Sequence, residues 1–158
     1  MMKLRFLCAN HRGELEKNTG KTITFFQTGF DTGQFYTDRL QWAEAIPHLG
    51  CAFESAEILL SHGSVDMEVS CDWLTSSALL LAISFKYTNY TNEAEDVIWM
   101  AINRLEQQLT HRSSDPRWVS HHLARLYGQL KICITLNEHG AKNHHDQANL
   151  STATARIH

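Results

Sequence analysis

Apolar residues recur at three- and four-residue steps through most of the chain, which is the spacing of one buried face of an α-helix. The pattern is strong from about Trp42 to Ser61, and His62-Gly63-Ser64 then supplies a C-terminal stop. The positions that share the apolar face of this segment are Ala45, Leu49, Ala52, Phe53, Ala56, Leu59 and Leu60. This segment is therefore a stronger helix prediction than the one before it, about Thr22 to Leu40, which Gly29 and Gly33 weaken.

Three further helices follow from the same pattern. The expected ranges are about Asp72 to Tyr87, about Asn92 to His111, and Pro116 to about Glu138. Asp115 is a suitable N-cap for the last of them, with Pro116 at its first position, and Gly140 is expected to end it. Strand patterns are nearly absent. The sequence therefore predicts an all-α protein of about five helices, arranged as antiparallel hairpins in a solenoid or in a compact bundle.

The two ends of the chain are less regular than this helical domain, which spans residues 22–138. Residues 1–21 mix a short apolar run with Gly13 and Gly20, and are expected to be an irregular lead-in, with a short strand as the open alternative. Residues 139–158 are polar and lack apolar periodicity, so they are expected to form a disordered tail.

Composition narrows the classes of function. At 158 residues the chain fits one domain, and its net charge of −3 gives no basic surplus for binding nucleic acid. The apolar start is too short for a signal peptide, and no apolar run approaches the roughly 20 residues of a membrane span. The four cysteines lack CxxC pairing, as expected of reduced thiols. These features together predict a cytoplasmic protein without a membrane segment.

Two segments share a pattern of small residues. They read Ala45-x3-Leu49-x2-Ala52 and Ala94-x3-Ile98-x2-Ala101, and each first alanine follows an aromatic residue, Tyr36 or Phe85, nine positions earlier. With Gly33 and Ala82 before the aromatic residues, this pattern resembles the tetratricopeptide repeat over about residues 26–137. Leu123-Ala124-x2-Tyr127 resembles the first helix of a third unit.

The distance between the two units differs from that of the family. Ala45 and Ala94 are 49 residues apart, where contiguous repeats give about 34, so about 15 additional residues are expected between the units, within residues 61–74. The prolines that commonly end each unit are missing. A generic helical bundle that uses the same small residues for close packing remains an alternative.

The resemblance implies a concave groove lined by the first helix of each unit, which binds a peptide or a helix of a partner protein. Carried over by position, the groove residues are Phe30, Gln34, Thr37 and Asp38 in the first unit, Leu79, Ile83, Lys86 and Tyr87 in the second, and His121, Arg125, Gly128 and Gln129 in the third, with Trp118 near the rim. The alternative for Phe30, Leu79 and Ile83 is a place in the core.

Chemical motifs are weak by comparison. Asn18-Thr19-Gly20-Lys21-Thr22 resembles the end of a phosphate-binding loop, but Leu15 stands where that loop needs a glycine. Cys8-x2-His11 and His48-x2-Cys51 together offer four ligands that suit zinc, against the favoured alternative of buried thiols and exposed imidazoles. No catalytic motif is present, so we expect neither an enzyme nor a cofactor.

Three functions remain open at this stage. The leading hypothesis is a protein-binding module. The second is a regulatory or sensor protein that holds a small ligand or a metal ion between helices. The third is a structural component that associates with itself as a homodimer.

Overall fold

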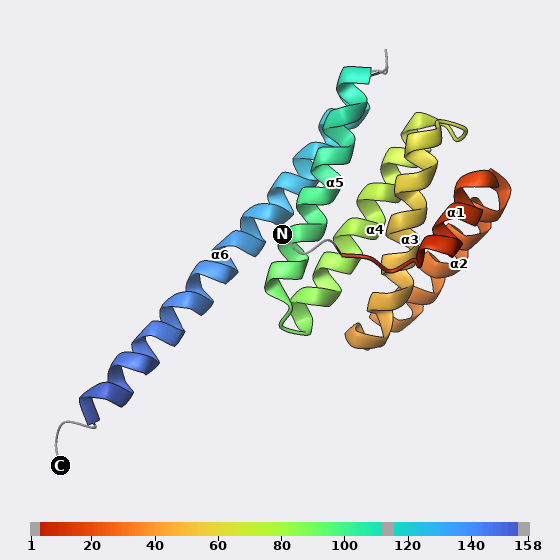
Figure 1. The fold of residues 1–158 in the computed structure, drawn as a ribbon. Helices are drawn as coiled ribbons and strands as arrows, with labels where there is room; N and C mark the ends of the chain where they lie inside the picture. Colours follow the sequence, from red (N-terminus) through yellow and green to blue (C-terminus); the bar gives the residue numbers. More distant parts are fainter. Residues whose placement is uncertain (1–3, 112–115, 155–158) are drawn as a thin grey trace.

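The computed structural model describes residues 4–111 and 116–154, and within them every regular element is a helix (Figure 1). The all-α prediction is confirmed, with six helices where about five were expected. They are α1 (Ala9–Lys17), α2 (Thr19–Thr37), α3 (Trp42–His62), α4 (Met67–Tyr87), α5 (Thr91–His111) and α6 (Pro116–Thr154).

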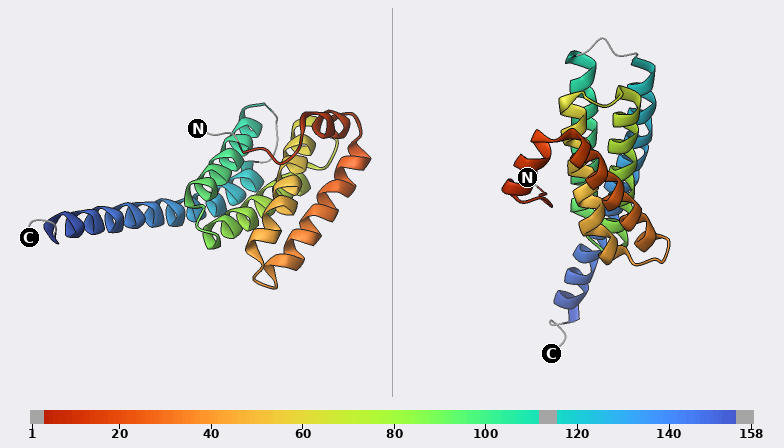
Figure 2. Two further views of the ribbon diagram at one scale, coloured as in Figure 1. Left: turned by 60° about the horizontal axis from the view of Figure 1, so that its bottom comes forward. Right: turned by 90° about the vertical axis from the view of Figure 1, so that its right-hand side faces the viewer.

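Consecutive helices pack side by side from α2 to α6, and α4 also contacts both α2 and α6 (Figures 1 and 2). Since α4 touches all four of these neighbours, it is the central member of the array. The C-terminal part of α6 projects beyond the other helices in each view.

Small residues let α2 and α3 approach closely. A Cβ at Gly33 would lie 2.5 Å from two side-chain carbons of Leu49, and a Cβ at Gly29 would lie 3.0 Å from the carbonyl oxygen of His48. Ala45 and Ala52 on the facing side of α3 are fully buried. The glycines that weaken α2 as an isolated helix are therefore the residues that allow it to pack on α3.

The connection between α3 and α4 is shorter than the sequence predicted. Gly63 ends α3 in the left-handed conformation with φ 65°, and α4 begins at Met67 rather than at Asp72. Asp66 caps α4, because its Oδ1 accepts N–H bonds from Glu68 at 3.0 Å and Val69 at 3.4 Å. Part of the additional chain expected in residues 61–74 therefore extends α4 instead of forming a loop.

Both ends of the chain are more helical than predicted. The expectation of an irregular lead-in is wrong for residues 9–17, which form α1, and α2 already starts at Thr19. The predicted end at Gly140 is wrong as well, because α6 continues to Thr154. A glycine inside a helix costs about 1 kcal/mol relative to alanine, which does not end α6 at Gly140, whereas Gly63 ends α3 in the left-handed conformation.

The most enclosed segment is the second half of α3, where every residue from Ala52 to Leu60 is buried. Helices α2 and α4 cover two sides of it, and the N-terminal segment (residues 4–8) with α1 covers a third (Figure 1). This cover encloses two glutamates, Glu54 and Glu57, along with the apolar residues.

Candidate functional site

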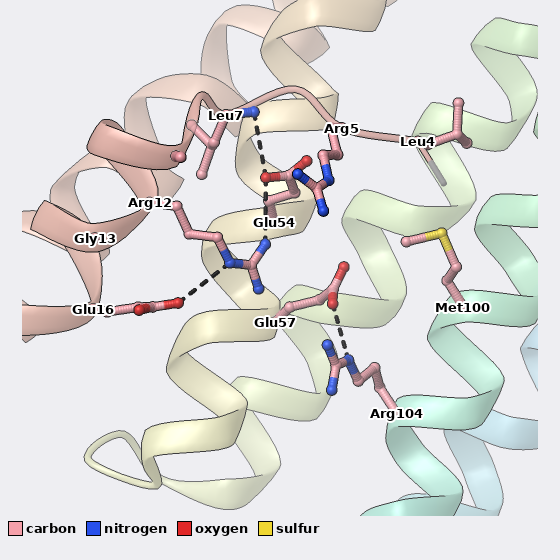
Figure 3. Close-up of a pocket in the computed structure, with 11 residues that line it drawn as sticks. Leu4, Arg5, Leu7, Arg12, Gly13, Glu16, Glu54, Glu57, Met100 and Arg104 are labelled. Carbon is pink, nitrogen blue, oxygen red and sulfur yellow. Dashed lines mark hydrogen bonds and ion pairs between the residues drawn. The ribbon is translucent and has the colours of Figure 1, made fainter. Parts of the chain in front are cut away.

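The buried glutamates of α3 lie in a polar cavity beneath the N-terminal segment (Figure 3). Glu54 is only 3% exposed, and its carboxylate accepts N–H bonds from the backbone of Phe6 at 2.6 Å and of Leu7 at 3.3 Å. The guanidinium of Arg12 on α1 lies 3.5 Å from the same carboxylate. Glu54 therefore binds the N-terminal segment and α1 to the middle of α3.

Glu57 lies one turn further along α3 and is 4% exposed. Its Oε2 accepts an N–H bond from Arg104 of α5 at 2.9 Å. Burial raises the pKa of Glu57 above its usual value, and the positive charge of Arg104 opposes part of that rise. This pair connects α5 to α3 in the same way that Arg12 connects α1.

The cavity around these glutamates has a volume of about 270 Å³. That is below the roughly 300–1,000 Å³ of pockets that hold drug-sized ligands. Three arginines and three glutamates line it, so its formal charges balance: Arg5, Arg12, Arg104, Glu16, Glu54 and Glu57. Both buried carboxylates already have partners inside the molecule. We therefore interpret the residues around this cavity as a structural contact that holds the N-terminal segment on α3, and not as a ligand site.

A second, smaller cavity of about 220 Å³ lies between α2 and α4. We call it the aromatic–acidic pocket, and its lining residues are Phe26, Gln27, Phe30, Asp31, Asp72, Trp73 and Ser76. The ring of Phe26 is stacked on that of Trp73, with centroids 4.6 Å apart, and on that of Phe30, at 5.7 Å. Phe30, one of the predicted groove residues, therefore lies at a cavity and in contact with the core at once.

Helix α6 reaches the edge of the aromatic–acidic pocket, where its Arg125 lies close to Asp72 of α4. The Nη1 of Arg125 lies 3.9 Å from Oδ1 of Asp72, which brings another predicted groove residue to the edge of the pocket. His121, also predicted, packs its ring against that of His122. His122 is buried with no hydrogen-bond partner at Nδ1, and desolvation lowers the pKa of its imidazole.

The remaining predicted residues of α4 fall in two places. Leu79 and Ile83 are half-buried, and Leu79 packs against the core. Tyr87 is 59% exposed and stacks on Trp42 of α3 at 4.6 Å, with Lys86 5.7 Å above its ring. Tyr87 thus belongs to the end of the bundle where the α2–α3 and α4–α5 connections lie together (Figure 1).

One predicted groove residue on α2 cannot line a groove. Thr37 is buried at 6% exposure, and its hydroxyl donates to the carbonyl oxygen of Gln34 at 2.9 Å, so its assignment is wrong. The side chain of Gln34 is exposed, and Asp38 is the exposed C-cap residue of α2. The family resemblance placed Thr37 and Asp38 together in the groove, but neighbouring positions on a helix point in different directions, so Asp38 is exposed where Thr37 is buried.

The α6 positions are mostly open to solvent. Trp118 is 46% exposed, Gln129 is half-buried, and Gly128 has no atom within 4 Å of where a Cβ would lie. Trp118, His121, Arg125 and Gln129 follow one another at three- and four-residue steps, and Ile132 continues the series at 47% exposure.

The sequence did not identify Asp31, Asp72 or Trp73 as site residues. Asp72 was expected only as the first residue of a helix, whereas it lies inside α4 and lines the pocket. The spacing of residues on α2 could have indicated part of this pocket. Phe26 and Phe30 are four residues apart and share a face of the helix, and the same holds for Gln27 and Asp31. The position of Trp73 opposite them depends on how α4 packs against α2.

The proposed zinc ligands do not gather in the described part of the chain. No group of three or more histidine, cysteine or acidic side chains able to hold a metal ion occurs there. Cys8 instead caps α1, its Sγ accepting the N–H of His11 at 3.5 Å, and His48 stacks on Tyr36 at 5.6 Å. Within residues 4–111 and 116–154, no helix has both the length and the apolar character needed to cross a bilayer.

Comparison with known proteins does not assign this site. No protein-family model matches the sequence, and no match is found among curated proteins or among solved structures.

Proposed function

We propose that this protein is a non-enzymatic, cytoplasmic binding module that docks a peptide or a helix of a partner protein, in the manner of a tetratricopeptide-like repeat. The binding surface is the face shared by α2, α4 and α6. Two features support this arrangement: the close α2–α3 packing through Gly29 and Gly33, and the contact of α4 with both α2 and α6.

The observation that carries the proposal is the aromatic–acidic pocket on this face. It combines partly exposed aromatic rings with carboxylates and a small cavity, and central aromatic anchors in pockets supply much of the energy of protein interfaces. Exposed or half-buried apolar side chains extend the surface along α4 and α6, namely Leu79, Ile83 and Ile132.

A peptide-display selection on the immobilised protein tests the proposal. Selected peptides are expected to bind the purified protein with a measurable Kd in fluorescence anisotropy, and Ile132→Glu is expected to weaken that binding at least about tenfold by placing a charge in the interface. Leu109→Glu is the matched control, because Leu109 is 40% exposed and lies on α5, outside the proposed face. Equal affinity of both variants and the unmodified protein would contradict this surface.

Self-association is the second candidate, and the long α6 favours it. Ile132, Ile134 and Leu136 are 47%, 37% and 38% exposed on a helix that projects beyond the bundle. Sedimentation equilibrium tests this alternative. A dimer that Ile132→Glu dissociates would support it, and a monomer at all concentrations would exclude it.

A further inference from the structure

We infer that the aromatic–acidic pocket receives an arginine side chain of the docked peptide. This inference rests on the proposed function and specifies the partner of the same surface.

The aromatic part of the pocket is partly exposed. Phe26 is buried at 3% exposure and supports two half-buried aromatic side chains, Trp73 and Phe30. A planar guanidinium stacks on aromatic faces of this kind and is attracted by their negative quadrupole. The volume of about 220 Å³ suits one side chain better than a whole small molecule.

The charged part of the pocket selects a cation. Asp31 from α2 and Asp72 from α4 are both exposed, and no lysine or arginine is among the residues that line the cavity. An anionic occupant would meet the carboxylates of Asp31 and Asp72, and the cation nearby, Arg125, makes only a loose contact with Asp72, at 3.9 Å. Arginine suits the pocket better than lysine because one planar group can stack on a ring and donate in a fork to a carboxylate.

Arg125 shows that a guanidinium can approach this pocket. Its Nη1 is 3.9 Å from Asp72, and both side chains are exposed, at 40% and 56%, so the contact is loose. A partner arginine must share Asp72 with this residue. Removing the charge of Arg125 should therefore strengthen binding of an external arginine.

The first test is an NMR titration with N-acetyl-arginine methylamide, observing the indole N–H of Trp73, which is assigned through Trp73→Phe. The Trp73 signal is expected to shift with millimolar affinity, and the isosteric, uncharged citrulline derivative is expected to leave it unchanged. Asp31→Asn and Asp72→Asn should each weaken the interaction about 2- to 5-fold, and Arg125→Gln should strengthen it by a similar factor.

Glu44→Gln is the control, because Glu44 is an exposed carboxylate of α3 that does not line the pocket. Unchanged binding in Asp31→Asn would overturn the inference, and an equal loss in Glu44→Gln would overturn it by showing a non-specific charge effect. Circular dichroism of each variant verifies that the helices are retained.

The second test separates this inference from the proposed function. Peptides obtained by display are resynthesised with each arginine replaced by citrulline. Loss of binding supports the inference. Peptides that bind the α2–α4–α6 face without needing arginine would overturn the inference and leave the binding function in place. A Trp73 shift with arginine, but no selectable peptide, would support the cation site and contradict the peptide-binding function.

Discussion

The ring of Phe6 lies against α3 at Gly50, in the space that a side chain at position 50 would occupy. The backbone N–H of the same Phe6 donates to Glu54, one turn further along α3. The ring also lies 6.4 Å from that of Phe85 on α4. The N-terminal segment is thus held at one residue by a steric fit and by a partly buried hydrogen bond.

Gly50→Ala is expected to destabilise the protein by about 1–3 kcal/mol, because the new methyl group overlaps the Phe6 ring. Chemical unfolding measures the loss, and trypsin cleavage after Arg5 should become faster as the segment loosens. In a Phe6→Ala background the same substitution should cost little, since its obstacle is gone. Equal costs in both backgrounds would show that Phe6 is not the obstacle.

Gly33→Ala and Gly128→Ala should change stability in opposite directions. Both glycines are inside helices, where alanine is favoured by about 1 kcal/mol. A Cβ at Gly33 meets Leu49 at 2.5 Å, and overpacking of this kind costs about 1–3 kcal/mol, whereas a Cβ at Gly128 meets nothing within 4 Å. Thermal unfolding of the two variants measures both effects. A stabilised Gly33→Ala would contradict the close packing of α2 on α3.

Arg104→Met leaves the carboxylate of Glu57 buried without its ion partner, and is expected to cost about 3 kcal/mol at pH 7. The pKa of Glu57 is already raised by burial, so the folded state binds its proton more readily than the unfolded state does. Stability linked to this group therefore declines as pH rises from its ordinary pKa to its folded pKa. Without Arg104 the folded pKa rises further, and the deficit relative to the unmodified protein should be smaller at pH 5 than at pH 7.

The double variant Glu57→Leu, Arg104→Met is the control for this prediction. Replacing both members of a buried ion pair with apolar residues is often neutral or stabilising, so we expect its stability to lie within about 1 kcal/mol of the unmodified protein. The stability of the double variant should also lack the difference between pH 5 and pH 7 that is expected for Arg104→Met alone. A double variant as unstable as Arg104→Met would show that the packing of the Arg104 side chain, not the unpaired carboxylate, causes the loss.

Cys8 is expected to react first with iodoacetamide in the folded protein. Cys8 is exposed, whereas Cys71 is buried, with a pKa raised to about 11 by desolvation. At pH 8 only about one in a thousand Cys71 thiols is then ionised, and only the thiolate reacts. Burial also raises the pKa of Cys51 and Cys133. Mass spectrometry of timed digests measures the order, and Cys8→Ser should remove the fast phase. Equal rates at Cys8 and Cys71 would contradict the buried position of Cys71.

Much of the helical framework follows from local sequence. The segment from Trp42 to about Ser61, the stop at Gly63 and the start at Pro116 were all predictable, because helix periodicity and capping depend on residues within about four positions of one another. The small residues that pack α2 on α3 were visible as a repeated pattern. The candidate surface was predictable only in part: Phe30 and Arg125 lie at the pocket, and Thr37 is buried.

The order of amino acids alone therefore specifies the succession of amphipathic helices and the positions of several helix ends. The burial of Glu54 depends on tertiary packing, because its partner amides at Phe6 and Leu7 are 48 and 47 residues away in the chain. In the same way, Asp31 and Asp72 became walls of one pocket only when α2 packed beside α4. Periodicity shows which side of a helix is apolar, but the environment of a charged side chain depends on segments that are distant in sequence and adjacent in space.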